Sequence, residues 1–240
     1  MSDMTEWYPK MSEYFQAEME HGEAHLVPFE VSKSDSDFSK LRACNPNDRN
    51  AYVPEGRYIK LLVDGVLMMS DTPMEQDTMR PFLDNACGDV LIGGLGLGIA
   101  TLCAERNQYV KSITVIEKSE DVIRLIAKHV PFATTTRFIH GSVFDLHTDD
   151  HYDTIYMDIW PNICTDNLDG MTKLRKMYLP LLKKRGWFGC WEEDELHWCA
   201  SCGDVPGWCN FVEADDGEEV CENCLDSYNE DMYEEEEDDA

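Results

Sequence analysis

Residues 93–98 constrain this chain more than any other segment, because Gly93, Gly94, Gly96 and Gly98 fall within one short turn. An apolar run at 89–92 leads into the turn, a helix-forming stretch at 99–106 follows it, and a β-rich run at 112–116 ends on Glu117. Glycine lets the backbone bend sharply and approach a ligand, since no Cβ blocks the way. Strand, glycine turn, helix, strand and terminal acid together predict a nucleotide-cofactor site, with Glu117 accepting the ribose hydroxyls.

The spacing of the glycines narrows the type of cofactor. Gly94, Gly96 and Gly98 read G-x-G-x-G, whereas the dinucleotide fingerprint places its third glycine where Ile99 stands. The turn also lacks the lysine of a phosphate-binding P-loop. The pattern is similar to the turn that holds S-adenosylmethionine in class I methyltransferase-like folds. The alternative is a glycine-rich turn of an α/β domain that binds no ligand.

Further strands and helices alternate after this segment. Strands are predicted at 136–140, 152–157 and 186–191, and helices at 120–130, where Ser119 caps the start, and at 166–184. This order predicts an α/β fold with a doubly wound, mostly parallel Rossmann-like sheet that is truncated after its fifth strand. Ligands bind at the carboxyl ends of such strands, where this chain carries the glycine turn, Glu117, Ser142 and Asp158.

The region before the glycine turn has weaker signals. A short amphipathic helix is predicted at 7–20 and a loop at 32–50. Residues 57–70 predict a β-hairpin, because Asp64-Gly65 between two apolar runs is the signal of a two-residue turn. A helix is expected over 72–85, with Thr72 and Glu75 forming a capping box.

Composition excludes several classes of function. The chain has 240 residues and a formal net charge of −28, which disfavours broad nucleic-acid binding. The densest basic cluster, at 183–185, is expected at a helix end. The polar, acidic start shows no signal peptide, and no apolar stretch is long enough to span a membrane, so a cytoplasmic protein is expected.

The cysteines gather toward the C-terminus. Cys199 and Cys202 form one C-x2-C pair, Cys221 and Cys224 form another, and residues 203–220 separate them. That spacing predicts a structural zinc site with four thiolate ligands; reduced buried thiols or a redox pair are the alternatives. We therefore divide the chain into an N-terminal helix and hairpin region at 1–80, a cofactor-binding core at 81–192, a zinc-ribbon-like module at 193–228 and a disordered acidic tail at 229–240.

Residues 56–191 resemble the spermidine synthase-like branch of the class I S-adenosylmethionine-dependent fold. Four segments carry the resemblance: 61–67, 92–98, 116–123 and 152–158. The segments 69–75 and 156–161 also resemble methyltransferase-like proteins of phages and bacteria. The resemblance implies S-adenosylmethionine as cofactor and a homodimer as one possible assembly.

Carried over residue by residue, the resemblance places the ribose-binding acid at Glu117, followed by Lys118, and the adenine contact at Ser142 and Val143. Ser142 replaces an aspartate of the family, and Gly96 replaces the aspartate that grips the amine of an aminopropyl donor. At the catalytic strand end, Asp158 stands where the family has two acids. These departures argue against polyamine synthesis and leave S-adenosylmethionine binding intact.

Asp158 and Trp160 are the candidates for chemistry. Asp158 could bind the amino group of the cofactor or accept a proton from an amine nucleophile, and Trp160 could stack on a planar or cationic substrate. The alternatives are that Asp158 caps a turn and Trp160 belongs to the core. Asp71, at the hairpin-to-helix junction, is a weaker candidate for substrate binding.

The leading hypothesis is an S-adenosylmethionine-dependent methyltransferase whose acceptor is an unidentified small molecule or protein. One alternative is an aminopropyltransferase. The other is a non-catalytic cofactor-binding protein that meets a partner through its zinc module and acidic tail.

Overall fold

The computed structural model describes residues 8–44, 52–145, 148–193, 211–215, 219–221, 224–225 and 227–228. The chain forms two compact units. The first comprises Met1–Asn162 and Met171–Trp191, and the second comprises Ile163–Gly170 and Glu192–Ala240.

A five-stranded sheet forms the centre of the first unit, and all its neighbouring strands run parallel. The strand order is β7-β6-β5-β8-β9. The strands span Gly88–Gly93 (β5), Val110–Glu117 (β6), Thr136–His140 (β7), Tyr152–Met157 (β8) and Leu182–Cys190 (β9). The chain moves outward from β5 through β6 to β7, then returns to β8 beside β5. This reversal is the switch point of a doubly wound Rossmann-like sheet, which confirms the predicted α/β fold.

Three helices connect these strands: α4 (Ile99–Arg106), α5 (Glu120–Ala127) and α6 (Asn167–Tyr178). Because parallel crossovers are right-handed, α4 and α5 cover one face of the sheet and α6 covers the other. The hydroxyl of Ser119 accepts the Val122 N–H at 3.2 Å and caps α5, as predicted. The apolar runs of β5 and β6 supply the centre of the core, where Val90, Ile92 and Val115 are fully buried.

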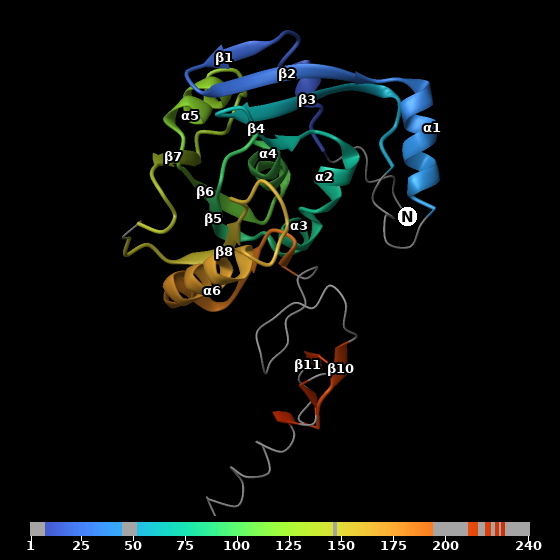
Figure 1. Cartoon of the computed structure of the whole chain (residues 1–240). Helices are drawn as coiled ribbons and strands as arrows, with labels where there is room; N and C mark the ends of the chain where they lie inside the picture. The colour runs from blue at the N-terminus through green and yellow to red at the C-terminus, as the bar shows by residue number, and fades with distance from the viewer. Residues whose placement is uncertain are drawn as a thin grey trace, which may run out of the picture. The chain divides into compact units, whose positions relative to one another are not determined.

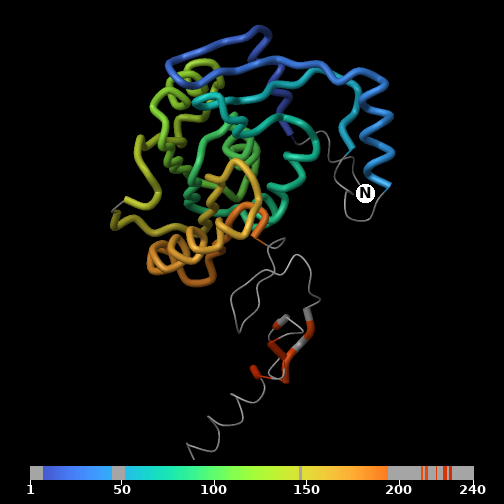
Figure 2. The backbone as a smooth tube through the Cα atoms, viewed as in Figure 1, coloured from blue at the N-terminus to red at the C-terminus, as the bar shows by residue number. Residues whose placement is uncertain are grey.

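A second, antiparallel sheet precedes the central one, in the order β1-β2-β3-β4. Its strands span Met19–His21 (β1), Ala24–Val31 (β2), Gly56–Val63 (β3) and Val66–Ser70 (β4). The predicted hairpin at 57–70 is confirmed as β3 and β4, with positive φ angles of 50° at Asp64 and 73° at Gly65. Figures 1 and 2 show this blue-to-cyan sheet above the strands of the central sheet.

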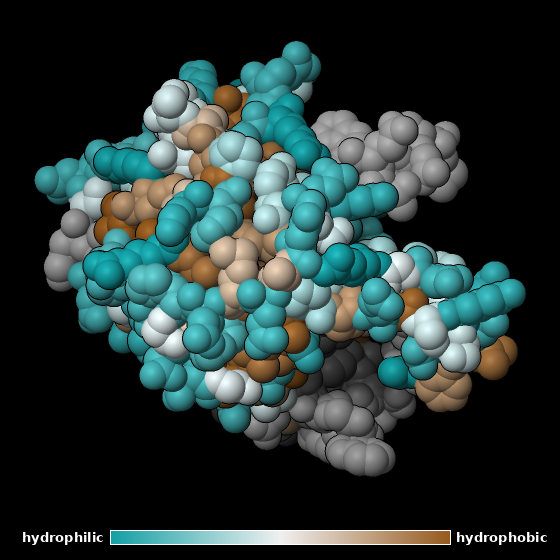
Figure 3. All heavy atoms as spheres, turned by 90° about the horizontal axis from the view of Figure 1, so that it is seen from above, coloured by the Kyte–Doolittle hydropathy of each residue, from teal (hydrophilic) through white to brown (hydrophobic). Residues whose placement is uncertain are grey.

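The surface of this unit is largely hydrophilic on the side from which the N-terminal sheet is seen. Hydrophilic residues cover most of that face, and hydrophobic residues show between them (Figure 3). Several apolar side chains of the sheet are buried, among them Leu26, Ile59 and Leu61, whereas Val66 and Leu67 of β4 are exposed. Apolar burial therefore joins the N-terminal sheet to the rest of the first unit.

The predicted helix at 7–20 is wrong. Only a 3-10 turn, η2 (Met11–Glu13), forms there, and the end of the segment belongs to β1. Met11 and Phe15 are fully buried, as an amphipathic helix would require. However, residues 19–21 pair with β2, and this pairing satisfies their backbone hydrogen-bonding groups in a strand instead of a helix.

The predicted loop at 32–50 is also wrong, because α1 (Lys33–Arg42) occupies much of it. Ser32 and Asp35 form a reciprocal capping box, in which the Ser32 hydroxyl accepts the Asp35 N–H at 3.3 Å. The helix has no apolar face turned to a core: Phe38 is 65% exposed and Leu41 71% exposed. Hydrophobic periodicity therefore could not reveal it.

The predicted helix at 72–85 forms as two short helices, α2 (Pro73–Asp77) and α3 (Arg80–Asn85). Pro81 lacks an N–H and would clash with the preceding turn of a continuous helix. The predicted capping box is absent, since the Thr72 side chain makes no capping hydrogen bond. The Glu75 carboxylate instead accepts hydrogen bonds from the N–H and the hydroxyl of Ser70.

The helix predicted at 166–184 ends early, at Tyr178, because Pro180 follows. A 3-10 turn, η4 (Leu179–Leu181), leads directly into β9, so Lys183 lies in a strand instead of at a helix end. Its ammonium donates to Asp89 Oδ2 at 2.6 Å and to Asp153 Oδ2 at 2.9 Å. One cation thus joins β5, β8 and β9 at their amino ends.

These contacts change the titration of both acids. The hydrogen bonds from Lys183 and then Ser112 hold the pKa of Asp89 below its usual value. Burial raises the pKa of Asp153, but the Asp89 N–H and Lys183 outweigh it and leave that pKa lowered. The same pairing raises the pKa of Lys183. The ionised cluster is therefore the form that the fold stabilises.

The second unit contains the short antiparallel pair β10 (Phe211–Glu213) and β11 (Glu219–Cys221). Ala214 and Val220 are its buried apolar residues among those described. The predicted acidic tail at 229–240 lies outside the described residues. None of the helices in the described part of the chain combines the length and apolar character that a membrane span requires.

Replacing Lys183 by Met should lower the free energy of unfolding at pH 7 by about 0.5–1 kcal/mol, because the cluster is partly exposed. The lowered pKa values of Asp89 and Asp153 stabilise the fold above the unfolded-state pKa of about 4, and this contribution disappears as the pH falls through the folded-state values. The difference from the wild type should therefore shrink in acid. Urea unfolding at pH 7 and pH 3 measures it. Lys184→Met, at an exposed neighbouring position, is the matched control, and equal losses in both variants would contradict the assignment.

Candidate functional site

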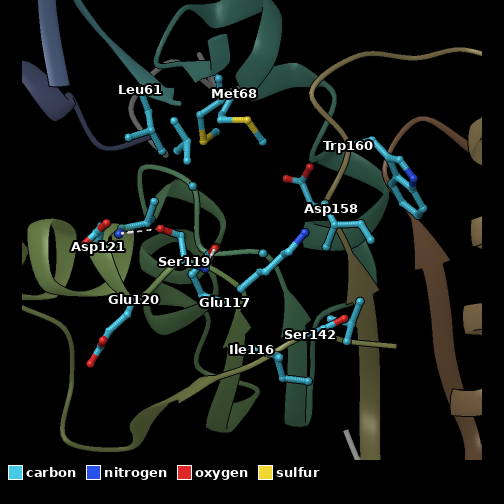
Figure 4. Close-up of a pocket in the computed structure, with 18 of the residues that line it drawn as sticks. Leu61, Met68, Ile116, Glu117, Ser119, Glu120, Asp121, Ser142, Asp158 and Trp160 are labelled. Carbon is cyan, nitrogen blue, oxygen red and sulfur yellow. Dashed lines mark hydrogen bonds between the residues drawn. The ribbon is translucent and has the colours of Figure 1, made fainter. Parts of the chain in front are cut away.

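A cleft of about 850 Å³ opens at the carboxyl ends of the parallel strands. The residues after β5, β6, β7 and β8 form its floor, and the β3–β4 hairpin of the N-terminal sheet forms its roof. Figure 4 shows Leu61 and Met68 on the roof side, Ile116 and Ser142 on the floor side, and Asp121 and Trp160 toward opposite ends. The cleft therefore lies where a doubly wound sheet binds its ligands.

The glycine turn forms one wall of the cleft, through Gly94 and Gly96. Both have positive φ angles, 92° and 51° respectively. A Cβ on Gly94 would lie 1.9 Å from the backbone oxygen of Asp158, so the turn and the end of β8 approach too closely for any side chain. The other two predicted glycines do not line the cleft: Gly93 ends β5, and Gly98 is the N-cap of α4.

Glu117 is fixed at the end of β6 by two backbone donors. Its Oε2 accepts the Leu95 N–H at 2.8 Å, and its Oε1 accepts the Ser119 N–H at 2.7 Å. The carboxylate thereby joins the glycine turn to the start of α5 while it lines the cleft. A carboxylate offers about four acceptor sites, so both oxygens keep capacity for hydroxyl donors.

Asp158 and Trp160 follow β8 and line the end of the cleft opposite Asp121 (Figure 4). The Asp158 N–H donates to the Gly93 carbonyl at 2.7 Å, which fixes the backbone beside the glycine turn. Both side chains are half-buried. The structure therefore places the acid and the aromatic ring where they can meet a ligand.

Ser142 and Val143 follow β7 and also line the cleft. The Ser142 hydroxyl accepts the Phe144 N–H at 3.1 Å, and the Val143 carbonyl accepts the Tyr178 hydroxyl at 2.7 Å. Lys118 lines the cleft with an exposed side chain, and its carbonyl contacts the His140 ring at 3.1 Å. These predicted residues and Glu117 thus share one cavity.

Asp71 lies apart from the cleft. Its carboxylate is 4% exposed and accepts the Ile59 N–H at 2.6 Å and the Met11 N–H at 3.0 Å. Burial raises the pKa of Asp71, although the two N–H donors act in the opposite direction. Asp71 therefore has a structural role, in which it ties the N-terminal segment to β3.

Several lining residues escaped the sequence analysis because they come from the N-terminal sheet or meet it. Glu23 lies in the β1–β2 turn, and its N–H donates to Asp121 Oδ2 at 3.1 Å. The His21 ring contacts Asp121 Oδ1 at 3.0 Å. Hydrogen bonds from Glu23 and His21 lower the pKa of Asp121. No local sequence pattern could indicate this contact, because residues 21 and 121 meet only in the folded chain.

The described lining is strongly acidic. Lys118 is the basic residue among the described lining residues. The acids are Glu23, Asp64, Glu117, Glu120, Asp121 and Asp158. Because opposite charges attract, this lining favours neutral or cationic groups over phosphates.

Comparison with protein-family models and with curated proteins gives no match. Several solved structures are similar in fold. Spermidine synthase from Thermotoga maritima is 15% identical, with a TM-score of 0.46 over 72% of this chain and 55% of that one. The N-methyltransferase NodS from Bradyrhizobium japonicum is 16% identical, with a TM-score of 0.37 over 48% and 64%. A putative caffeoyl-CoA O-methyltransferase from Staphylococcus aureus is 19% identical, with a TM-score of 0.35 over 47% and 53%. The chain spans less than two thirds of the length of these structures.

The predicted zinc site falls mostly outside the described residues. Cys199 and Cys202 lie there entirely, and the side chain of Cys221 is also not described. Among the residues that the structure does describe, no three His, Cys, Asp or Glu side chains gather as metal ligands. The zinc site stays a prediction.

Elemental analysis tests that prediction directly. Protein purified without chelator should contain about one zinc ion per chain, since a closed four-cysteine site holds a single ion. Cys224→Ser should lose most of the metal, whereas Cys44→Ser, at an exposed cysteine, should keep it. Well under one zinc in the wild type would contradict the proposed site.

Gly94→Ala should destabilise the fold by about 2–4 kcal/mol, because the added methyl meets the backbone of Asp158 in addition to the strain of a positive φ. Gly65→Ala is the control: its φ is 73°, but nothing lies within 4 Å of the added Cβ. Strain alone should therefore cost that variant about 1–2 kcal/mol. Urea unfolding of both variants separates the two contributions, and equal losses would contradict the close approach of the turn to β8.

Proposed function

We propose that the cleft binds S-adenosylmethionine and that the protein is a methyltransferase. The observation that carries the proposal is Glu117, whose two oxygens are fixed by the Leu95 and Ser119 N–H groups while the carboxylate lines the cleft. An acid held in this way at the end of the second strand is preorganised for the two hydroxyls of a ribose. The volume of about 850 Å³ lies within the usual range for a ligand of this size.

The remaining lining residues fit the other parts of such a ligand. Gly94 and Gly96 leave the backbone open to close approach. The Ser142 hydroxyl and the buried apolar side chain of Val143 suit a purine ring. Asp158 would hold the ammonium group of the amino-acid portion of S-adenosylmethionine through a charge-assisted hydrogen bond.

When bound, S-adenosylmethionine supplies a methyl group already activated by its sulfonium. The protein then needs mainly to orient an acceptor and exclude water. Trp160 offers a ring face beside Asp158 for a planar or cationic acceptor. Asp158 can also accept the proton of an amine nucleophile. The acidic lining favours a neutral or cationic acceptor, either a small molecule or a protein segment.

The other two hypotheses make different demands on the site. An aminopropyltransferase needs an acid beside the donor's amine, and Gly96 offers none there. A non-catalytic protein would bind the nucleoside without turnover. The shape and the lining of this cleft fit a methyltransferase better than either alternative.

Titration calorimetry with S-adenosylmethionine tests the proposal. The wild type should bind, and Glu117→Ala should bind about 5–150 times more weakly, because buried hydrogen bonds worth about 1–3 kcal/mol are lost. Asp84→Ala, on the exposed side of α3, is the control and should bind as the wild type does. Unchanged affinity in Glu117→Ala, or no binding by the wild type, would refute the site.

Transfer of radiolabelled methyl groups to fractionated cell extract separates an enzyme from a binding protein. The wild type should label an acceptor fraction, and Asp158→Ala should reduce the rate by about 10²–10⁴ if Asp158 is the general base. Binding without any transfer, unaffected by the Asp158 variant, would favour the non-catalytic alternative.

A further inference from the structure

The outer edge of β4 is not paired with any strand in the described part of the chain. β4 is the last strand of the antiparallel sheet, and β3 is its neighbour on the other side. Edge strands are commonly protected by lysine, proline or a covering segment, but Val66–Ser70 contains neither a charged residue nor a proline. Val66 is 52% exposed and Leu67 is 49% exposed. The end of the β3–β4 hairpin therefore presents an accessible, apolar strand edge.

The geometry of the hairpin determines which backbone groups of β4 face outward. Residues 64–65 both have positive φ angles and form a two-residue turn, so the flanking Val63 and Val66 are a hydrogen-bonded pair. Hydrogen-bonded and non-hydrogen-bonded pairs alternate along an antiparallel ladder, which makes Leu62 and Leu67 a non-hydrogen-bonded pair. The N–H and the C=O of Leu67 therefore point away from β3, where an added strand could pair with them.

The same edge borders the cleft. Asp64, in the turn, and Met68, in β4, both line the cavity, and Figure 4 shows Met68 on its roof side. Met68 has no directly opposed residue in the register of β3 and β4, and a bulge of this kind changes the direction of a side chain. A segment bound along Leu67 would therefore lie at the rim of the cleft.

The edge is accessible over only part of its length. The sulfur of Met69 accepts the Leu97 N–H at 3.0 Å, so β4 rests on the glycine turn at that point. Ser70, the last residue of the strand, is buried. The accessible edge is thus limited to residues 66–68, which is long enough for a short extended segment and leaves the glycine turn untouched.

The charge of the cleft indicates what kind of segment would bind there. The described lining residues include six acids, Asp64 among them, and one base, Lys118. Such a lining attracts cationic side chains and repels acidic segments and phosphate groups. Because alternate side chains of an extended strand point to the same side, a segment paired with Leu67 can direct a cationic side chain into the cleft.

We propose that the outer edge of β4 binds an extended, lysine-containing segment of another protein, and that this segment is the methyl acceptor. The inference rests on the proposed function and narrows its acceptor to a protein. The main chain of the segment would pair with Leu67, and its apolar side chains would contact Val66 and Leu67. Main-chain pairing supplies affinity in such strand addition, whereas the pockets for alternate side chains supply specificity.

The transfer itself needs no further reactant. The lysine ammonium loses a proton to the carboxylate of Asp158, which lines the cleft, and the proton then passes to water. The nitrogen lone pair forms a bond to the methyl carbon while the bond from that carbon to sulfur breaks. The bonding electrons stay on sulfur, so S-adenosylhomocysteine and methyl-lysine are the products.

A synthetic peptide of alternating lysine and threonine tests the binding mode. Fluorescence anisotropy in the presence of S-adenosylhomocysteine should show that it binds to the wild type. The same peptide with N-methylated backbone amides cannot donate to the Leu67 carbonyl and should bind about tenfold more weakly or worse. A counterpart with glutamate in place of lysine should not bind.

Three variants test the protein side of the same contact. Leu67→Pro removes the outward N–H, a change that edge strands tolerate, and should weaken peptide binding about five- to tenfold. Leu67→Ala keeps that N–H and should have a smaller effect. Tyr109→Ser, at a 68% exposed side chain before the amino end of β6, is the control and should bind as the wild type does. All three should bind S-adenosylmethionine normally. If Leu67→Pro fails to fold, the N-methylated peptide still tests the pairing.

Methyl transfer and sedimentation complete the test. With S-adenosylmethionine, mass spectrometry should find methyl-lysine in the peptide and little or none in free lysine amide. Equal methylation of lysine amide would identify a small-molecule acceptor and overturn the inference. A dimer of the wild type that Leu67→Pro dissociates would show that a second copy occupies the edge, which also overturns it.

The outcomes separate this inference from the proposed function. A wild type that does not bind S-adenosylmethionine refutes the proposed function. A wild type that binds S-adenosylmethionine but not the lysine peptide, or binds the N-methylated peptide equally well, overturns the role of the β4 edge alone.

Discussion

The carboxylate of Glu117 is the contact on which the arrangement of the cleft depends. It accepts the N–H of Leu95 in the glycine turn and the N–H of Ser119 at the start of α5. The backbone oxygen of the same residue accepts the Gly141 N–H at 2.9 Å, at the end of β7. One residue thus sets the positions of three chain segments that leave the sheet at different strands. Since backbone donors fix the carboxylate before any ligand arrives, little rearrangement is needed for binding.

The N-terminal sheet completes the cleft, and its own anchoring explains how it can do so. Asp71, which directly follows β4, is buried and satisfies the N–H groups of Met11 and Ile59. Desolvation of this carboxylate is unfavourable, so it persists only because both donors are buried with it. These hydrogen bonds fix the position of β3, and Leu61 and Val63 of β3 line the cleft. The wall that faces the ligand therefore depends on a polar contact some distance from it.

The sequence predicted the central sheet well because its signals are local. Strands β5 and β6 are both apolar runs. The glycine turn directly follows β5, and Glu117 is the last residue of β6. The β3–β4 hairpin of the roof was also predicted, but its contacts with the floor of the cleft could not be predicted in the same way. Met69 meets Gly96, and Asp121 of α5 meets His21, only after the N-terminal sheet has packed onto the rest of the first unit. Helix α1 was not predicted for a different reason. Its capping box uses Asp35 where Glu or Gln is usual, and its apolar residues are exposed.

The two ends of the parallel sheet differ in how they are held. At the amino ends, Lys183 joins Asp89 and Asp153 through ion pairs that acid would weaken. At the carboxyl ends, the close approach of Gly94 to the Asp158 backbone and the 2.7 Å bond from the Asp158 N–H to Gly93 involve no titratable group. These two backbone contacts do not titrate, whereas the Glu117 carboxylate, which holds the glycine turn at the same end, is ionisable. The contact of the His21 ring with Asp121 Oδ1 at 3.0 Å joins β1 to the first turn of α5, so the N-terminal sheet is tied to an acid of the cleft by a side-chain contact as well as by apolar packing.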